Sequence, residues 1–444
     1  MLVRLFDHHN STDMLGGMQS TQIEIFRDGH WLPAATLEPL ADDRARLDYL
    51  PEYIFSNDPW PVSLALPVAF TAPDESGRWP APAFLYDLVP QGKGRKLLVD
   101  LLGVRDHDAL VLPLVLAGAF NPVGALRLAS ASGFCHDHLR GNPPPPSEND
   151  GFTRQELASK EHHVLEHLST YAMLASGTTG VQGVSPKFLL TEDMHGRLHA
   201  DLALDDTRAR AHWLVKGPRN SSDDDRTVLR NEAAYLRVAA ACGLRVHAPA
   251  HITHASNLLF VPRFDRHVSD GTVQRLHQES LASLAGLQGF GVPCHQNRLL
   301  QALRAHASDP LAETIEFLRR DVLNLAMRNT DNHARNHAVQ RLPDGRIQLT
   351  PLFDFAPMYL DPELIARSLH WVDAAGVRVH TWTEALDWLA LPDAERETVR
   401  VALRAFASTV AALPATMRDH GVDTPIIEAC RQSIDGQARQ LAAL

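Results

Sequence analysis

Cysteine is scarce in this sequence, with four residues among 444. They lie far apart and form no CxxC pair: Cys135, Cys242, Cys294 and Cys430. Neither a disulfide framework nor a cysteine-based zinc site can be read from this spacing. A reducing cytoplasm is therefore the expected compartment.

The chain also lacks a long apolar run. The longest, at residues 110–120, is interrupted by Pro113 and is too short to span a bilayer. No apolar segment follows the charged residues Arg4 and Asp7 near the N-terminus. We therefore expect neither a signal peptide nor an association with a membrane.

An excess of positive charge is absent as well. The formal net charge is −11, whereas neutralising nucleic-acid phosphates requires clustered Lys and Arg, so direct DNA binding is not expected. The hydrophobic content of 45% and the charged content of 21% are typical of a globular protein. A chain of this length can form two or three packed domains.

A proline-rich segment divides the chain. Residues 143–146 are consecutive prolines, which cannot donate backbone hydrogen bonds, so we interpret residues 141–152 as a connector. It separates an N-terminal subdomain at residues 1–140 from a strand-rich part at 153–266 and a mostly helical part at 267–444.

Within the N-terminal subdomain, β-like stretches at residues 22–26 and 62–66 mix with a helix that begins near Gly94. This α+β region contains no catalytic motif of its own.

Short apolar runs between turn residues predict strands after the connector, at residues 188–190, 213–216 and 258–261. A helix is expected from Asn231 to Cys242, where Gly243 ends it. The acidic residues 223–225 before this helix are expected to form a solvated loop.

Apolar residues then recur at alternating spacings of four and three, which predicts one buried face of a long helix. These residues are Leu311, Ile315, Leu318, Val322 and Leu325. A β-hairpin is predicted next, at residues 337–350, around a Pro-Asp-Gly turn.

The strongest candidate for chemistry lies between this helix and the hairpin. Asp331 and Asn336 are five residues apart, the separation of the Asp and the Asn in kinase catalytic loops. Asp331 would orient an acceptor hydroxyl, and Asn336 would bind magnesium. The alternative interpretation is an Asn- and Asp-rich turn that caps the helix.

A second carboxylate follows the hairpin, where Asp354 stands between Phe353 and Phe355. This position suits a metal ligand at the edge of an apolar cleft, although a solvated turn aspartate is the alternative. Because the two elements are joined by one hairpin, their combination is far more specific than either alone.

Lys216 ends a predicted strand, where it could bind phosphate; a surface lysine with an apolar stem is the alternative. Glu232, sixteen residues later on the predicted helix, is a candidate partner for this lysine. Asp224 and Asp225 compete with Glu232 for that role.

A glycine-rich segment at residues 177–187 is the candidate phosphate loop. Glycines let the backbone approach an anion closely, and successive N–H groups can surround it. The segment lacks the GxxxxGK[ST] pattern, so it is not a Walker loop.

Taken together, these elements resemble the HipA family of bacterial toxin kinases, and a YjjJ-like branch within it. The resemblance covers most of the chain and includes FLYDLVPQG at residues 84–92 in the N-terminal subdomain. The ordered motifs of the remainder are GVSPK at 183–187, WLVK at 213–216, NEA at 231–233, FVPRFDR at 260–266, RLHQE at 275–279, NTDNHARN at 329–336 and FDF at 353–355.

This resemblance implies an α+β, two-lobed protein-kinase-like fold with a strand-rich N-terminal subdomain and a mostly helical C-terminal lobe. It implies an ATP- and magnesium-dependent serine/threonine protein kinase with Asp331 as the catalytic residue and with Asn336 and Asp354 as magnesium ligands. The implied ATP-binding residues are Gly183, Val184, Ser185, Lys187, Lys216, Val261, Phe264, His333 and Asn336.

Three departures from the family pattern are visible. Ser185 replaces a Gln in the phosphate loop, which bears on how phosphate is held. Val261-Pro262 stands where Val-Glu is usual in the adenine-reading hinge, and Glu279-Ser280 replaces Glu-Asp. No catalytic carboxylate is lost, so we expect an active kinase.

Kinases of this family inactivate themselves by phosphorylating a serine near the phosphate loop. The hydroxyls closest to that position here are Thr178 and Thr179, with Ser176 and Ser185 as further candidates. Added negative charge there would repel the phosphates of ATP. The alternative is that these are loop hydroxyls bonded to their own backbone.

The resemblance also suggests partners. An aminoacyl-tRNA synthetase is the implied protein target, and a helix-turn-helix antitoxin is an implied binding partner. A small-molecule phosphotransferase and a non-catalytic co-repressor of a toxin–antitoxin operon are the alternatives.

Overall fold

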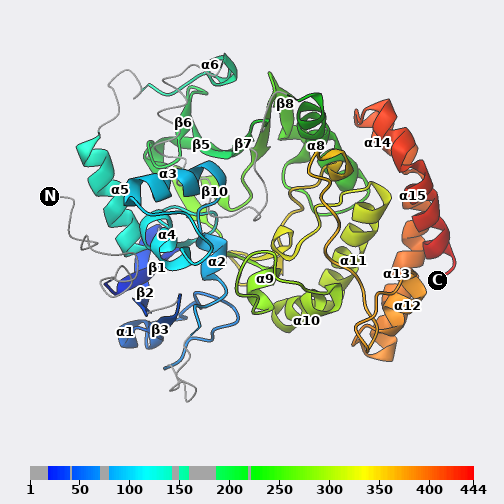
Figure 1. Cartoon of the computed structure of the whole chain (residues 1–444), viewed down its shortest axis with the longest axis horizontal. Helices are drawn as coiled ribbons and strands as arrows, with labels where there is room; N and C mark the ends of the chain where they lie inside the picture. The colour runs from blue at the N-terminus through cyan, green and yellow to red at the C-terminus, as the bar shows by residue number, and fades with distance from the viewer. Residues whose placement is uncertain (1–18, 41–42, 71–79, 143–149, 160–186, 219–221) are drawn as a thin grey trace.

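The computed structural model describes residues 19–40, 43–70, 80–142, 150–159, 187–218 and 222–444. The N-terminal elements and the C-terminal helices lie at opposite ends of the molecule (Figure 1). Mixed sheet and helix thus form a two-lobed arrangement, as the sequence predicted. In the described part of the chain, no helix is both long and apolar enough to cross a membrane.

The N-terminal subdomain is built on an antiparallel sheet of order β3-β2-β1-β4. Its strands are β1 (Thr21–Arg27), β2 (His30–Pro39), β3 (Ala45–Tyr49) and β4 (Leu126–Leu128). Its helices are α1 (Pro51–Ile54), α2 (Leu85–Leu88), α3 (Gly92–Leu102), α4 (Val111–Gly118) and α5 (Ala129–Gly141). The predicted strand at residues 22–26 and the helix near Gly94 are confirmed by β1 and α3.

Helix α4 accounts for the longest apolar run of the sequence. All of its residues are buried, so the run forms the centre of the N-terminal core. Pro113 fits because the first turn of a helix has no intrahelical N–H bond to lose.

A second antiparallel sheet, of order β6-β5-β7-β9-β8, joins the two ends of the molecule. Helix α6 (Arg154–Ser159) precedes it. The strands are β5 (Lys187–Asp193), β6 (Leu198–Ala200), β7 (Ala209–Lys216), β8 (Thr253–Ala255) and β9 (Leu258–Pro262), with helix α8 (Asp223–Ala241) between β7 and β8. All three strands predicted after the connector are therefore present.

The two faces of this sheet pack on different cores, because successive side chains of a strand point to opposite faces. Leu258 and Phe260 belong to the core of the N-terminal subdomain, whereas Leu259 packs into the core that contains α8. On β7, Trp213 and Val215 face the N-terminal core in the same way. The next residue, Lys216, therefore points toward α8.

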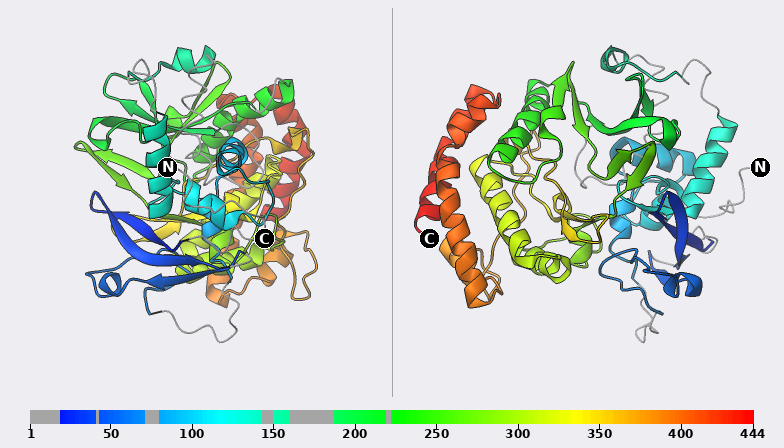
Figure 2. Two further views of the ribbon diagram at one scale, coloured as in Figure 1. Left: turned by 60° about the vertical axis from the view of Figure 1, so that its left-hand side comes forward. Right: turned by 180° about the vertical axis from the view of Figure 1, so that it is seen from behind.

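The C-terminal lobe is mostly helical. Helices α13 and α15 pack against α11 and form the outer layer at the C-terminal end (Figures 1 and 2). The helices are α9 (Leu281–Leu284), α10 (Gln296–His306), α11 (Pro310–Ala326), α12 (Trp382–Asp387), α13 (Asp393–Ala411), α14 (Leu413–Asp419) and α15 (Thr424–Ala442). Its strands are β12 (Gln278–Ser280), β13 (Ala338–Arg341) and β14 (Ile347–Leu349), whereas the hairpin of β10 (Arg266–Ser269) and β11 (Thr272–Arg275) packs against β7 and β1.

The predicted long helix and hairpin are confirmed by α11 and the β13–β14 pair. Helix α11 begins after Asp309, whose side chain accepts a hydrogen bond from the N–H of Ala312 at 3.0 Å, with Pro310 in the first turn. Asp309 is therefore the N-cap of α11. The ring of Pro310 fixes its φ near the helical value. Arg328, just beyond the helix, has a φ of 57°, so the chain turns sharply there. The chain then enters residues 329–336, the predicted catalytic loop.

Two local predictions are wrong. Residues 62–66 form no strand but a tight turn with an isolated bridge between Ser63 and Leu66. The reason is that the N–H of Leu64 donates to the carboxylate of Glu279 at 2.8 Å instead of to a neighbouring strand. A tertiary contact replaces the ladder that the apolar pattern suggested.

The acidic residues 223–225 are not a loop but the first turn of α8. Ser222 caps this helix by accepting a hydrogen bond from the N–H of Asp225 at 3.2 Å. Three aspartates at a helix N-terminus are favourable because the helix dipole is positive there. A Ser followed by acidic residues was a readable helix-start signal.

Candidate active site

Two lysines lie side by side at the ends of neighbouring strands in the sheet of order β6-β5-β7-β9-β8. Lys187 at the start of β5 lies opposite Lys216 at the end of β7. The buried Nζ of Lys216 donates to Oε1 of Glu232 on α8 at 2.6 Å, and it also bonds the carboxylate of Asp354. Nζ of Lys187 lies 3.7 Å from the second oxygen of Asp354.

The charges of this group depend on one another. Burial disfavours the charge on Lys216, but Asp354 and Glu232 outweigh it and raise the pKa of Lys216. Burial also opposes ionisation of Asp354, yet Lys187 and Lys216 hold its pKa well below the usual range. For Lys187 burial prevails over the attraction of Asp354, so its pKa is lowered. The arrangement thus keeps Lys216 cationic and Asp354 anionic.

Asp354 also has an unusual backbone. Its φ of 50° places it in the left-handed region, which Asp tolerates better than most residues. The side chain of Asn329, in the catalytic loop, donates to the carbonyl of Asp354 at 3.4 Å. This contact connects the loop after α11 with the Asp354 segment.

The catalytic loop holds Asn336 in a defined orientation. Its Nδ2 donates to the backbone carbonyl of Asp331 at 2.8 Å. Its Oδ1 is buried and has no hydrogen-bond partner among the described residues. A buried amide oxygen without a donor normally costs free energy, so it is suited to a ligand that supplies positive charge.

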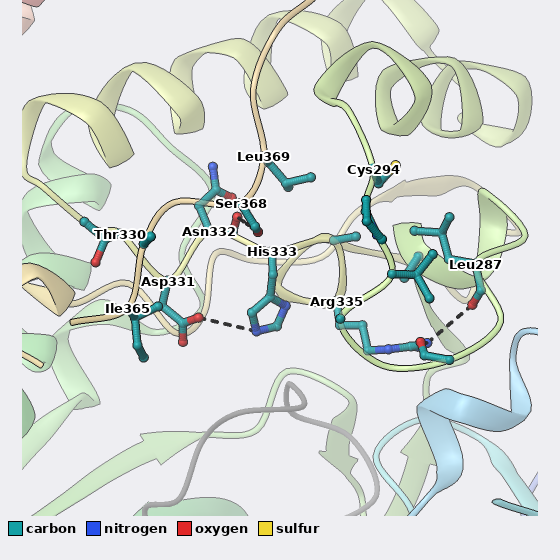
Figure 3. Close-up of a pocket in the computed structure, with 17 residues that line it drawn as sticks. Leu287, Cys294, Thr330, Asp331, Asn332, His333, Arg335, Ile365, Ser368 and Leu369 are labelled. Atoms are coloured by element: carbon teal, nitrogen blue, oxygen red, sulfur yellow. Dashed lines mark hydrogen bonds and ion pairs between the residues drawn. The ribbon is translucent and has the colours of Figure 1, made fainter. Parts of the chain in front are cut away.

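The carboxylate of Asp331 lies 3.6 Å from Nε2 of His333 (Figure 3). Burial raises the pKa of Asp331, with His333 opposing and Asp354 reinforcing the shift. Burial lowers the pKa of His333, against the attraction of Asp331 and Asp354. Asp331 therefore belongs to the same charged group as Asp354 and the two lysines.

These residues fit a magnesium–nucleotide site. Magnesium commonly takes one or two carboxylates from the protein and fills its octahedron with phosphate oxygens and water. Asp354 and the unpartnered Oδ1 of Asn336 are oxygen donors of that kind. Among the described residues, no group of three His, Cys, Asp or Glu side chains could hold a metal without such help.

The candidate hinge lies at the end of β9. Val261 pairs with Leu214 of β7, and the ring of Phe264 lies 6.0 Å from that of Phe353, next to Asp354. The predicted adenine-reading segment and the predicted metal-binding segment are therefore adjacent in space.

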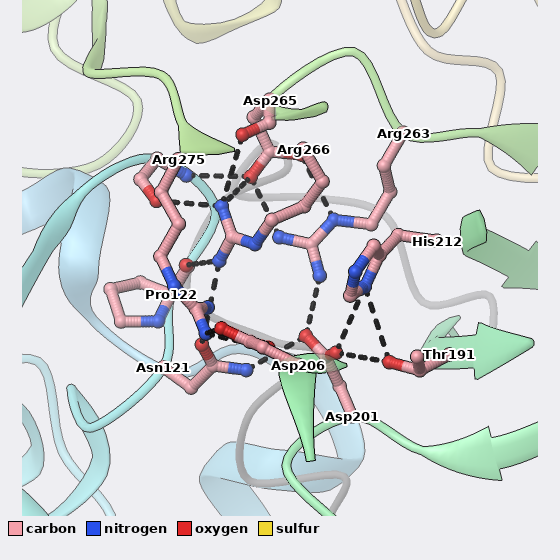
Figure 4. Close-up of polar contacts among 11 residues, drawn as sticks. Asn121, Pro122, Thr191, Asp201, Asp206, His212, Arg263, Asp265, Arg266 and Arg275 are labelled. Atoms are coloured by element: carbon pink, nitrogen blue, oxygen red, sulfur yellow. Dashed lines mark hydrogen bonds and ion pairs between the residues drawn. The ribbon is translucent and has the colours of Figure 1, made fainter. Parts of the chain in front are cut away.

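Buried ion pairs anchor the residues on both sides of Phe264 (Figure 4). Arg263 donates to Asp201 at 2.6 Å and to Asp265 at 2.7 Å. Arg266 donates to Asp265 at 2.6 Å and to the carbonyl of Gly124, in the N-terminal subdomain, at 2.7 Å. Buried charges are tolerated only when paired in this way.

A pocket of about 420 Å³ adjoins the other side of the catalytic loop (Figure 3). Asp331 and His333 line one end of it. Most of the remaining wall is apolar and includes Leu287, Val292, Pro293, Ile365 and Leu369. The pocket therefore offers space next to Asp331 for a molecule that carries an acceptor hydroxyl.

Sequence reasoning missed several residues that support this site. Asp87, from the N-terminal subdomain, pairs with Arg335 in the catalytic loop. Asp321 on α11 receives a hydrogen bond from Asn332, the neighbour of Asp331. Asp87 lies within the FLYDLVPQG motif, but neither that motif nor the pattern around Asp321 indicates a partner, because the partners are distant in sequence or in another element.

A family model of the HipA-like C-terminal domain matches residues 179–417, more than half of the chain. The chain belongs to the HipA family. Among curated protein sequences, none matches it.

Solved structures extend the likeness of this HipA-family chain beyond the matched domain. A structure of HipA from Shewanella oneidensis MR-1, with HipB and operator DNA, is 19% identical with a TM-score of 0.59. The two chains match over 95% of this chain and 96% of the Shewanella chain. The chain therefore has the HipA fold from its N-terminal subdomain to its C-terminal helices.

A second structure is the proinflammatory kinase CtkA of Helicobacter pylori. The two sequences are 15% identical, and the TM-score is 0.34. The match covers 52% of this chain and 91% of the CtkA chain. A likeness of that size supports no conclusion about the present HipA-family chain.

Some predictions lie outside the described residues of this HipA-family chain. They concern the phosphate-loop residues Gly183, Val184 and Ser185 and the autophosphorylation candidates Ser176, Thr178 and Thr179. These assignments and the domain boundaries stay predictions.

Proposed function

We propose that this chain is an ATP- and magnesium-dependent serine/threonine protein kinase of the HipA type. The observation that carries the proposal is the convergence of Lys216, Glu232 and Asp354 with a catalytic loop whose Asn336 presents an unpartnered buried oxygen. Phosphoryl transfer requires this set: a lysine for the phosphates, oxygen ligands for magnesium and a carboxylate near the acceptor.

Each residue would have a distinct role. Lys216 would bind phosphate oxygens, with Glu232 holding its ammonium in place. Asn336 and Asp354 would hold magnesium, which neutralises charge on the phosphates when bound. Asp331 would accept a hydrogen bond from the acceptor hydroxyl and orient it. Preorganised charge and positioning would then supply most of the rate.

The pocket beside Asp331 supports a protein acceptor. Apolar residues such as Leu287, Val292 and Ile365 line it beside polar side chains of the catalytic loop and Ser368. This mixture suits a peptide better than a sugar or an aminoglycoside, whose many hydroxyls and amines need polar partners throughout. A peptide segment can place an apolar side chain there while its Ser or Thr reaches Asp331. An aminoacyl-tRNA synthetase is the protein target that we propose.

The test is transfer of label from γ-labelled ATP with magnesium, using the full chain and mapping the product by mass spectrometry. Asp331→Asn should lower transfer by about 100-fold or more while leaving ATP binding intact. Asp344→Asn, in the exposed turn between β13 and β14, is the control and should retain activity. Label on Thr178 or Thr179 would also support loop autoregulation.

Two results would reject the protein-kinase proposal. One is labelling of an added aminoglycoside or sugar without labelling of any protein, which would indicate a small-molecule phosphotransferase. The other is the absence of any transfer by a folded wild-type chain that binds ATP.

A second candidate function is favoured by one comparison, since the Shewanella HipA structure contains HipB and operator DNA. We propose that this chain likewise joins a helix-turn-helix antitoxin in a repressor complex. Because the chain is acidic, the complex should bind operator DNA and the chain alone should not. Co-purification with the product of a neighbouring gene, followed by a DNA-binding assay, tests this role.

A further inference from the structure

Asp321 is a completely buried carboxylate at the centre of the C-terminal lobe. Its Oδ1 accepts hydrogen bonds from Gln296 at 3.0 Å and from Asn332 at 3.1 Å. The guanidinium of Arg367 bonds the same oxygen, and the indole N–H of Trp371 donates to Oδ2 at 2.8 Å. Four side chains thus converge on one aspartate.

These partners come from three separate segments. Gln296 begins α10, Asn332 follows Asp331 in the catalytic loop, and Arg367 and Trp371 belong to the segment between Asp354 and α12. Asp321 therefore connects elements that share no local structure.

Two of the connected segments lie side by side where they line the pocket beside Asp331 (Figure 3). The catalytic loop contributes Asp331 and Asn332, and the segment after Asp354 contributes Ile365, Ser368 and Leu369. A direct contact reinforces the link, since Oγ of Ser368 donates to the carbonyl of Asn332 at 3.1 Å. Asp321 thus ties together two adjacent segments that line the pocket next to Asp331.

None of the four partners belongs to the proposed nucleotide side of the site. Lys216 bonds both Glu232 and Asp354, and the hinge is anchored by Arg263 and its own partners. The network of Asp321 therefore makes no contact with Lys216, Glu232, Asp354 or the hinge, and it reaches the catalytic loop through Asn332.

We infer that Asp321 is a positioning residue for the acceptor side of the active site. It holds Asp331 beside residues 365–369 in the position that an acceptor hydroxyl requires, and it does not contact the lysines or the hinge proposed to bind ATP. This inference rests on the proposed kinase function and adds a residue to it. The buried charge connects the catalytic loop and residues 367–371 to a rigid helix.

Asp321→Asn in the full chain tests this role. The change keeps the side-chain shape but removes the charge that pairs with Arg367. We expect the rate of autophosphorylation at saturating ATP to fall by about 100-fold, as misplacement of a catalytic group by about 1 Å can cause. The KM for ATP and the affinity for ATP measured by calorimetry should change much less than the rate, because Lys216, Glu232 and the hinge are not contacted by this network.

A matched control lies on the same helix. Glu316 accepts hydrogen bonds from Arg320 at 2.9 and 2.8 Å and from the N–H of Arg245 at 3.0 Å. Neither partner lines the pocket or belongs to the catalytic loop. Glu316→Gln should therefore lower thermal stability while retaining the autophosphorylation rate. Equal loss of rate in both variants, or a loss of ATP affinity in Asp321→Asn as large as the loss of rate, would overturn the inference.

Hydrogen–deuterium exchange gives a readout that does not depend on activity. Asp321→Asn should speed exchange at residues 329–336 and 365–371 and leave β7 and β9 unchanged. If wild type transfers no phosphate but the variant shows this pattern, the kinase proposal fails and the positioning of the loop stands. Unchanged exchange in both segments would refute the positioning role.

If Asp321→Asn does not fold, Trp371→Phe is the second variant that tests the positioning role. It removes the indole N–H that donates to Asp321 and shortens the ring, while an aromatic group stays in the core. A smaller fall in the autophosphorylation rate, with faster exchange at residues 365–371, is expected. Wild-type rate and wild-type exchange in this variant would contradict the inference.

Discussion

Arg335, four residues after Asp331 in the catalytic loop, forms an ion pair with Asp87 of the N-terminal subdomain. Asp87 also accepts hydrogen bonds from the N–H and the Oγ of Ser280 at 2.9 and 2.7 Å. Arg335 further donates to the carbonyl of Gly289 at 3.0 Å. The N-terminal subdomain, which has no catalytic motif, thus holds the catalytic loop directly.

Asp87→Asn should therefore affect both stability and activity. Loss of this largely buried ion pair leaves the charge of Arg335 uncompensated, which costs about 3 kcal/mol of unfolding free energy. Displacement of the loop should lower the phosphotransfer rate by about 10- to 100-fold. Urea denaturation and a kinase assay measure the two effects.

The control for this prediction is Asp106→Asn, which breaks the more exposed pair with Arg95 in the same subdomain. It should leave the phosphotransfer rate unchanged, because it has no contact with the catalytic loop. An Asp87→Asn protein with wild-type rate and stability would show that the N-terminal subdomain does not position the loop.

The interface between the subdomain and the C-terminal lobe should also depend on pH. Glu279 accepts hydrogen bonds from Ser63 at 2.6 Å and from the N–H of Leu64 at 2.8 Å. Burial nevertheless raises the pKa of Glu279 from 4.5 to about 7. The folded protein therefore keeps this proton at a pH where the unfolded chain has released it.

The sign of the effect follows from this difference in bound protons. The free energy of unfolding should fall as pH rises from about 4.5 to about 7, by up to about 3 kcal/mol, and should then level off. Urea denaturation across this range, compared with Glu279→Gln, isolates the contribution, because other titrating groups are common to both proteins. A constant difference between the two proteins would contradict the prediction.

The buried ion pairs around the hinge predict a third effect. Asp265 accepts hydrogen bonds from Arg263 and Arg266 and from the N–H of Gly124 at 2.8 Å. Asp265→Asn should cost about 3 to 5 kcal/mol, because two buried arginines lose their shared carboxylate. It should also weaken ATP binding, since Phe264 stands between Arg263 and Asp265.

Thermal unfolding and calorimetric titration with ATP check these two effects. Asp270→Asn, in the exposed turn of the β10–β11 hairpin, is the control and should change neither. If Asp265→Asn is destabilised but its ATP affinity is unaltered, the ion pairs do not position the hinge for ATP binding.

The sequence predicted the elements whose signals are local. The four-and-three spacing from Leu311 to Leu325 marked α11, and the apolar runs marked β5, β7 and β9, because each pattern reflects burial of one face of one element. The five-residue spacing of Asp331 and Asn336 likewise lies within a single loop. The acidic start of α8 was missed although its signal, a capping Ser before three aspartates, was present.

Other features required the folded chain. The turn at residues 62–66 depends on Glu279, more than two hundred residues away. The same holds for the pairing of Asp87 with Arg335. Such contacts leave no periodic trace, because each partner is a single polar residue whose neighbours say nothing about the distant segment.

By itself, then, the sequence determined the order of the elements, the family resemblance and the identity of the charged residues that chemistry would use. Only the tertiary structure decided which partner each of these charges has. Lys216 bonds both Glu232 and Asp354, and Asp321 bonds residues of two segments that line the pocket or adjoin its lining. The physical reason is that periodicity reports whether a side chain is buried. The partner of a buried charge is instead chosen by the packing of the whole chain, which must pair that charge to repay its desolvation.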